Sequence, residues 1–172
     1  GDTSGMRTYP EYKDSGVEWI GEIPKEWKNS RLKYVTTYND IKLNDNTDPD
    51  YEFTYLEISD VDSQGRIGPG TVTTFGESPS RARRVLEKND VIISTVRTYL
   101  RSIGTITEDR ENLVGSTGFC VLKSRNELDH KYLSYLVITE WFIQKVVSNS
   151  EGVSYPAINP TDLVTIPVIL PP

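Results

Sequence analysis

Six basic side chains are concentrated between residues 81 and 101, where they outnumber two acids and give the segment a net charge of +4. Arg97 and Arg101 flank Tyr99 directly after residues 91–96, which predict a buried strand, so a rigid scaffold could aim them at a target. Arginine can form two hydrogen bonds with the edge of guanine, which provides about 1–3 kcal/mol of discrimination. The other basic residues suit phosphate contacts, which supply affinity and register but no sequence information. These basic residues are Arg81, Arg83, Arg84 and Lys88.

Hydroxyl groups in two other segments are further candidates for DNA contact, namely those of Ser116, Thr117, Ser154 and Tyr155. The candidates also have structural alternatives that the sequence leaves open. Arg97 could pair with an internal carboxylate, Tyr99 could belong to the core, and Ser116-Thr117 could only terminate a strand. Residues 81–84 lie in a polar segment flanked by Ser and Pro, which suggests flexible contact with a phosphate backbone.

Acidic residues are concentrated in residues 40–62, where eight acids accompany Lys42 alone and the net charge is −7. The whole chain carries −6, which on average repels DNA. A polyanion responds to the local patch, however, because charges beyond a Debye length of about 8 Å are largely screened. DNA binding through residues 81–101 therefore stays open. So does a protein-interaction domain that uses the acidic segment.

Recognisable catalytic chemistry is missing from the sequence. Cys120 and His130 are the only residues of their types, which excludes an intrachain disulfide and a zinc site built from Cys and His, although carboxylates could hold a hard cation. Residues 65–70 have the wrong glycine order for a dinucleotide loop. Residues 48–51 are similar to the motif with which adenine methyltransferases hold their target amine, but the third residue differs and no cofactor-binding glycine motif precedes it. We expect no catalytic residue, metal site or cofactor in this chain, and a nuclease or adenine-methyltransferase fragment is the enzymatic alternative.

The elements that must position these side chains are mostly short strands. Apolar alternation and β-branched runs predict extended segments over 51–55, 71–75, 91–96, 103–107, 118–122 and 164–170. Asp129 is a good N-cap for a helix that runs to about Val147, and Ser30 could cap a short helix through Val35. This pattern predicts an α+β fold, a single domain with a mixed, largely antiparallel twisted sheet and a few helices.

The length of 172 residues fits one domain, which we assign to residues 6–172. Residues 1–5, before Met6, look like a remnant of an expression vector. No stretch approaches the roughly 18 apolar residues of a membrane span, and no secretory signal is visible. Together with the single cysteine, these features predict a cytoplasmic protein with no membrane partner.

Four segments, in this order and spacing, resemble the DNA-specificity subunits of type I restriction-modification systems. In the second segment, 89–101, the family commonly has Gly-Asp, then a buried strand, then Arg-Pro-Tyr-Leu followed by a basic residue. This chain has Asn89 in place of that Gly and Thr98 in place of that Pro. Together the segments cover nearly all of residues 9–172. They are 12–24 with Trp27 and Leu32, 89–101, 116–122 and 152–172.

The resemblance implies a first target-recognition domain that binds double-stranded DNA and reads one half of a bipartite site without catalysing a reaction. It also implies two partners. A modification (methyltransferase) subunit would bind S-adenosylmethionine and methylate a flipped adenine, and a motor/restriction subunit would use ATP and magnesium to cleave DNA. In the family, Pro171-Pro172 leads into a long spacer helix, which is absent after residue 172. The chain could be an excised first domain or a natural half-subunit.

Overall fold

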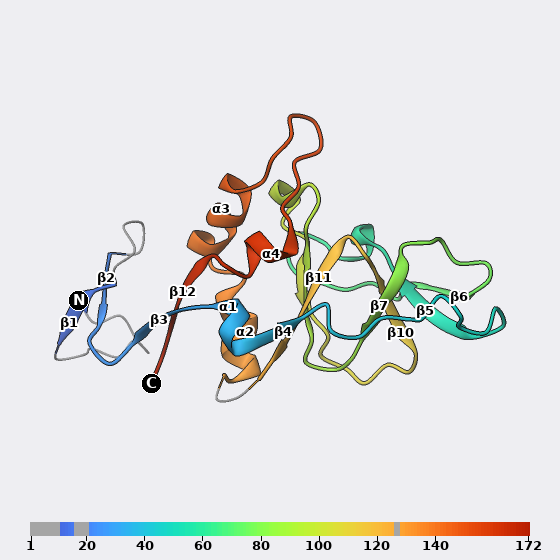
Figure 1. Cartoon of the computed structure of the whole chain (residues 1–172), viewed down its shortest axis with the longest axis horizontal. Coiled ribbons are helices and arrows are strands. Elements are labelled where there is room, and N and C mark those ends of the chain that lie inside the picture. The colour runs from blue at the N-terminus through green and yellow to red at the C-terminus, as the bar shows by residue number, and fades with distance from the viewer. Residues whose placement is uncertain (1–10, 16–20, 126–127) are drawn as a thin grey trace.

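The computed structural model describes residues 11–15, 21–125 and 128–172, which form two four-stranded sheets with helices gathered at one side (Figure 1). The first sheet has the order β6 (Thr71–Thr74), β5 (Glu52–Leu56), β10 (Leu113–Ser116), β7 (Ala82–Leu86). The second has the order β4 (Thr36–Tyr38), β11 (Phe119–Ser124), β8 (Val91–Ser94), β9 (Ile103–Thr105). Two small antiparallel pairs join β1 (Tyr12–Asp14) to β2 (Glu22–Pro24) and β3 (Lys28–Arg31) to β12 (Pro167–Leu170).

The pairing of the strands confirms the predicted α+β class. β5 and β10 run parallel, and every other strand pair among the described residues is antiparallel. The sheet is therefore mixed and largely antiparallel, as predicted, and the structure divides it in two.

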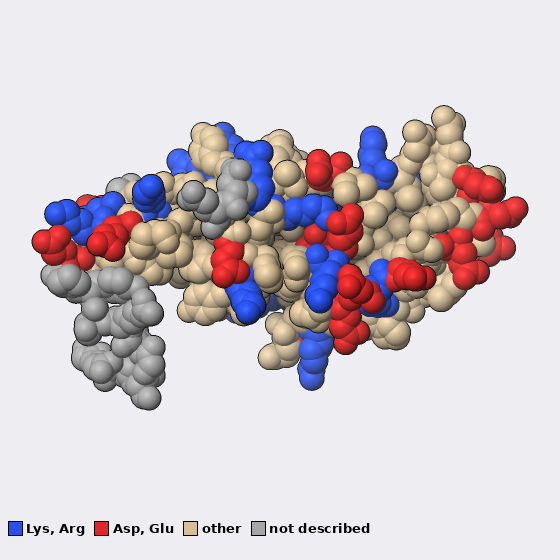
Figure 2. Space-filling view, turned by 90° about the horizontal axis from the view of Figure 1, so that it is seen from below, with Lys and Arg blue, Asp and Glu red and all other residues tan. Residues whose placement is uncertain are grey.

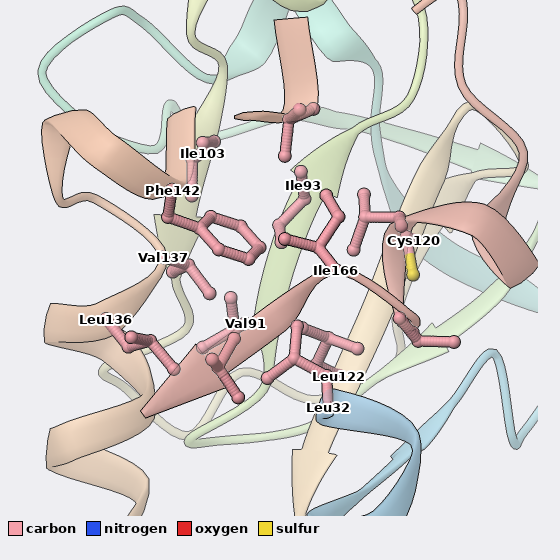
Figure 3. Packing of buried hydrophobic residues seen from close by; sticks show 14 of the residues in the cluster. Leu32, Val91, Ile93, Ile103, Cys120, Leu122, Leu136, Val137, Phe142 and Ile166 are labelled. Carbon is pink, nitrogen blue, oxygen red and sulfur yellow. The ribbon is translucent and has the colours of Figure 1, made fainter. Parts of the chain in front are cut away.

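Strand β8 is buried on both faces and so lies at the centre of the domain. Ile92 packs with Leu86 of the first sheet, whereas Val91 and Ile93 pack against the helices. A strand covered on both sides favours a continuous apolar run, which is why the sequence revealed this element. Figure 3 shows helical side chains closing over the helix-facing side of β8 and β11, among them Leu136, Val137 and Phe142.

The helices are α1 (Leu32–Val35), α2 (His130–Leu136), α3 (Glu140–Ser148) and α4 (Pro160–Leu163). The single helix predicted from Asp129 to about Val147 is therefore wrong, although Asp129 does cap α2 by accepting a hydrogen bond from Lys131 N at 2.8 Å. The break lies at Thr139, whose backbone is extended and whose hydroxyl donates to the Leu136 carbonyl at 2.7 Å. Such local side-chain bonds compete with the helical ladder.

Two further local predictions need correction. Residues 81–84, expected to be flexible, lead into and form part of strand β7, which is bonded to residues 41–43 on its outer side, with Leu43 N donating to Arg83 O at 2.8 Å. Ser30 lies in β3, and Arg31 is the residue that precedes α1. The expected vector remnant at residues 1–5, and residues 16–20 of the first family segment, lie outside the described residues.

Candidate nucleic-acid interface

Four strand ends meet along one edge of the two sheets. β8 and β11 are antiparallel, so the end of β8 lies beside the start of β11, and Thr95 N donates to Gly118 O at 2.8 Å. β7 and β10 are also antiparallel, and Thr117 N donates to Arg81 O at 2.8 Å. The turn between β10 and β11 therefore joins Arg81 to the loop that follows β8.

That loop, residues 96–101, holds two arginines in an unusual backbone conformation. Thr98–Leu100 form one turn of 3-10 helix, η2, and Arg97 and Arg101 on either side have left-handed φ values of 46° and 59°. Such a conformation costs about 1–3 kcal/mol per non-glycine residue and is concentrated at functional sites. The hydroxyl of Thr98, which is buried, is bonded to that of Ser150 at 2.7 Å. Tyr99 is half exposed, which excludes the alternative that it belongs to the core.

A second loop, residues 151–157, projects beside the first (Figure 1). Its base is closed by two hydrogen bonds between the backbones of Glu151 and Ala157, at 2.8 and 2.9 Å. It is tied to the other loop where Arg97 N donates to Pro156 O at 2.7 Å. The Arg97 guanidinium lies 4.5 Å from the centre of the Tyr155 ring. The two loops therefore bring together four predicted residues, Arg97, Tyr99, Ser154 and Tyr155.

We call this surface the arginine edge and define it as Arg81, Thr117 and the loops 96–101 and 151–157. It also carries exposed apolar side chains, which belong to Val96, Leu100 and Val153. Arginine, aromatic rings, hydroxyls and small apolar groups are the side chains that contact phosphates and base edges.

Two carboxylates pair with arginines of this edge. Both terminal nitrogens of Arg101 donate to the two oxygens of Glu140, at 2.6 and 2.7 Å. The hydrogen bonds from Arg101 and then from Gln144 lower the pKa of Glu140 to about 2. Arg81 donates to Glu57, and this bond raises the pKa of Arg81 above its ordinary value. The sequence left open a carboxylate partner for Arg97, but in the structure it is Arg101 that has such a partner, Glu140.

Sequence reasoning missed Glu57 and Glu140 as partners of these arginines. The position of Glu140 after Thr139, in the first turn of a helix, is visible only once the helix is known to break there. Its arginine lies 39 residues earlier in the chain, so no local spacing could reveal the pair.

The structure places the remaining predicted residues away from the exposed part of this edge. Arg83 has a side chain only 21% exposed, stacks on Phe75 at 4.5 Å and lies 3.5 Å from Asp45. Burial lowers the pKa of Arg84, whose Nε is buried without a hydrogen-bond partner. Ser116 is buried at the end of β10, where its hydroxyl accepts a hydrogen bond from Gly118 N at 3.0 Å. Lys88 precedes β8 and so lies at the opposite end of that strand from Arg97.

The charges on the surface follow this distribution. Figure 2 shows acidic side chains gathered at the end of the molecule where β5 and β6 lie, with basic and acidic side chains intermingled over the rest of that face. Within the described residues, no three His, Cys, Asp or Glu side chains form a group suited to a metal ion. In the same part of the chain, every helix is too short or too polar to span a bilayer.

The comparison with protein families is decisive for the classification. The sequence model of the family described as "Type I restriction modification DNA specificity domain" matches residues 24–172. The chain belongs to this family. Membership confirms the resemblance inferred from the four sequence segments.

Solved structures agree with the membership in the DNA specificity domain family. The HsdS subunit from Thermoanaerobacter tengcongensis matches with 32% identity and a TM-score of 0.75, over 87% of this chain and 39% of that one. A chain from a structure on complex assembly and conformational transition of the type I R-M system matches with 31% identity and a TM-score of 0.78, over the same shares, 87% and 39%. The specificity domain described here therefore spans about two fifths of these relatives.

A third structure, the type I restriction-modification S subunit from M. genitalium, is 15% identical with a TM-score of 0.51, over 84% of this chain and 34% of that one, and supports the fold alone. No curated protein matches the sequence.

Proposed function

We propose that this chain recognises one half of a bipartite DNA sequence as the non-catalytic specificity component of a type I restriction-modification complex. The observation that carries the proposal is the arginine edge. In a member of a DNA-specificity family, two interlocked loops present Arg97 outward on a strained backbone, stacked on Tyr155 and with no carboxylate partner among the described residues.

The contacts divide into two kinds. Arg97 is the candidate for direct base readout, because the stacked ring restricts its planar guanidinium, which can donate two hydrogen bonds to guanine. Tyr99, Ser154 and Tyr155, on the same two loops, could add hydroxyl contacts. Arg81 and Thr117, farther along the edge, suit the phosphate backbone. We assign no DNA contact to Arg83, Arg84, Lys88 or Ser116, because Arg83 and Arg84 are partly buried, Ser116 is buried and Lys88 lies at the opposite end of β8.

The proposal includes partners outside this chain. A modification subunit would carry S-adenosylmethionine, and a motor/restriction subunit would carry ATP and magnesium. The support is the likeness, at 31% identity, to a chain in a structure of type I R-M complex assembly.

Selection of bound duplexes from a random pool tests the proposal, using the domain joined to its spacer helices in the presence of the modification subunit. We expect one enriched half-site at a fixed position. The isolated chain makes only part of the contacts, so it should bind any duplex with a Kd of about 10⁻⁴–10⁻⁶ M at physiological salt. A selection without an enriched motif contradicts sequence recognition. Metal-dependent cleavage or methyl transfer by the purified chain contradicts the non-catalytic role and favours the enzymatic alternative.

A further inference from the structure

The two arginines that flank η2 have different partners, although they occupy equivalent places in the loop. Arg97 stacks on Tyr155, whereas Arg101 forms a two-pronged pair with Glu140. The terminal N–H groups that Glu140 occupies are the ones a phosphate or a guanine edge would use. In the free protein, Glu140 therefore covers the DNA-binding end of Arg101.

This pair is at the surface and can exchange partners. The side chains of Arg101 and Glu140 are 38% and 63% exposed. Exposed ion pairs contribute little to stability, since water and salt screen both charges. The Glu140 carboxylate is stabilised in place, because it lies in the first turn of α3 and also accepts a hydrogen bond from Gln144 at 2.9 Å.

We infer that Glu140 lowers the sequence-independent affinity of the chain for DNA by pairing with Arg101; this inference rests on the proposed function. Such affinity comes from phosphate contacts that release condensed counterions. An arginine that must first leave a carboxylate gains less from a phosphate than an unpaired one. The arrangement recurs at the other end of the arginine edge, where Glu57 accepts a hydrogen bond from Arg81.

The test is Glu140→Gln, which removes the charge and keeps the length of the side chain. The probe is a scrambled duplex, titrated with the whole chain across a salt series. One added phosphate contact releases about 0.9 counterion, which at 0.15 M salt corresponds to about a fivefold gain in affinity and a salt slope steeper by about one. A merely structural role for Glu140 would not increase the salt slope.

Two controls isolate the mechanism. Glu140→Gln in an Arg101→Gln background should give no gain, because the freed arginine is gone. Asp109→Asn makes the same change in net charge in the loop before β10, at the edge opposite the arginine edge, and should change affinity little. Thermal melts establish that each variant is folded. Glu140→Asp, which withdraws the carboxylate by one methylene, replaces Glu140→Gln if that variant does not fold, with a smaller gain expected.

Three results overturn the inference: a folded Glu140→Gln variant that binds no more tightly than wild type, a gain that persists without Arg101, or an equal gain from Asp109→Asn. If the wild type binds DNA in a salt-dependent way and selects a motif, but Glu140→Gln has no effect, this inference is wrong and the proposed function stands. The absence of both wild-type binding and an enriched motif defeats the proposed function as well.

Discussion

The two edges of the paired sheets are both built from strand ends, yet they differ in charge and in structure. The arginine edge presents exposed side chains on loops in which the left-handed residues are arginines, Arg97 and Arg101, whereas asparagines, Asn89 and Asn112, take that conformation at the opposite edge. At the opposite edge, the turn 87–90 and the loop 107–112 contain five carboxylates against Lys88 and Arg110. Arg110 there donates to two backbone carbonyls, those of Gly68 and Pro69.

The difference shows that basic residues close together in the sequence, such as those in 81–101, need not lie on one surface of the folded chain. β7 and β8 run in opposite directions from the turn 87–90, so Arg81 and Arg97 reach one edge while Lys88 remains at the other. The opposite edge is organised around Asp90, which is 3% exposed and accepts two hydrogen bonds from Lys123. One edge is thus suited to contact and the other to stability.

The largest effect should come from the opposite edge. Burial raises the pKa of Asp90, so its carboxylate depends on its partners. Asp90→Ala would leave the backbone N–H of Glu87 without its acceptor and Lys123 with only the exposed carboxylate of Glu87, and we expect a loss of about 3 kcal/mol in unfolding free energy by urea denaturation. Glu87→Gln, at an exposed carboxylate 3.3 Å from the same lysine, should cost under about 1 kcal/mol. Equal losses from the two variants would show that the buried pair has no special weight.

The next largest effect should come from the arginine edge and should concern binding. Arg97→Ala should cost about 1–3 kcal/mol on the selected half-site relative to a scrambled duplex, because it would remove the base contact proposed for Arg97. Lys88→Ala removes the same charge at the other end of β8 and should leave that difference unchanged. Titration of both duplexes measures the two variants, with thermal melts alongside. If Arg97→Ala stays folded and loses affinity equally on both duplexes, Arg97 is only a backbone contact.

A smaller effect separates the ring of Tyr155 from its hydroxyl. The ring lies 4.5 Å from the Arg97 guanidinium, and an exposed cation–π contact contributes about 0.5–1 kcal/mol. Tyr155→Leu should therefore reduce discrimination by about that amount, and Tyr155→Phe should preserve it. The same titrations serve as the measurement. Loss in the Phe variant would mean that the hydroxyl, rather than the ring, makes the contact.

The smallest effect is in the pH dependence of the Arg101–Glu140 pair. The pKa of Glu140 is lowered from 4.5 to about 2 in the folded chain. A depressed carboxyl pKa stabilises the fold above the unfolded value, and this contribution is lost as the pH falls from about 4.5 toward 2. The difference in melting temperature between wild type and Arg101→Gln should therefore be constant from pH 5 to 8 and shrink below pH 4.5. A difference that shrinks between pH 8 and 5 would contradict the pairing.

Much of the core could be predicted from the sequence because burial imposes a local pattern. The apolar run around Ile92 and the strand around Val121 required no long-range knowledge, and Asp129 had the residue type of an N-cap. Strands β7 and β10 were missed, since Arg83 and Arg84 conceal the pattern of one and Gly115 interrupts the other. The break at Thr139 was missed because the apolar spacing continues through it.

Sequence alone determined the fold class, the family and the residue types available for contact, because composition, periodicity and the four family segments are local properties of the chain. It also proposed Arg97, Tyr99, Ser154 and Tyr155. Only the tertiary structure decided which arginines act together. Antiparallel pairing brought Arg81 and Arg97 to one edge and Lys88 to the other, and helix packing placed Glu140 on Arg101 but not on Arg97. Such pairings depend on contacts between residues far apart in the chain, which no local spacing encodes.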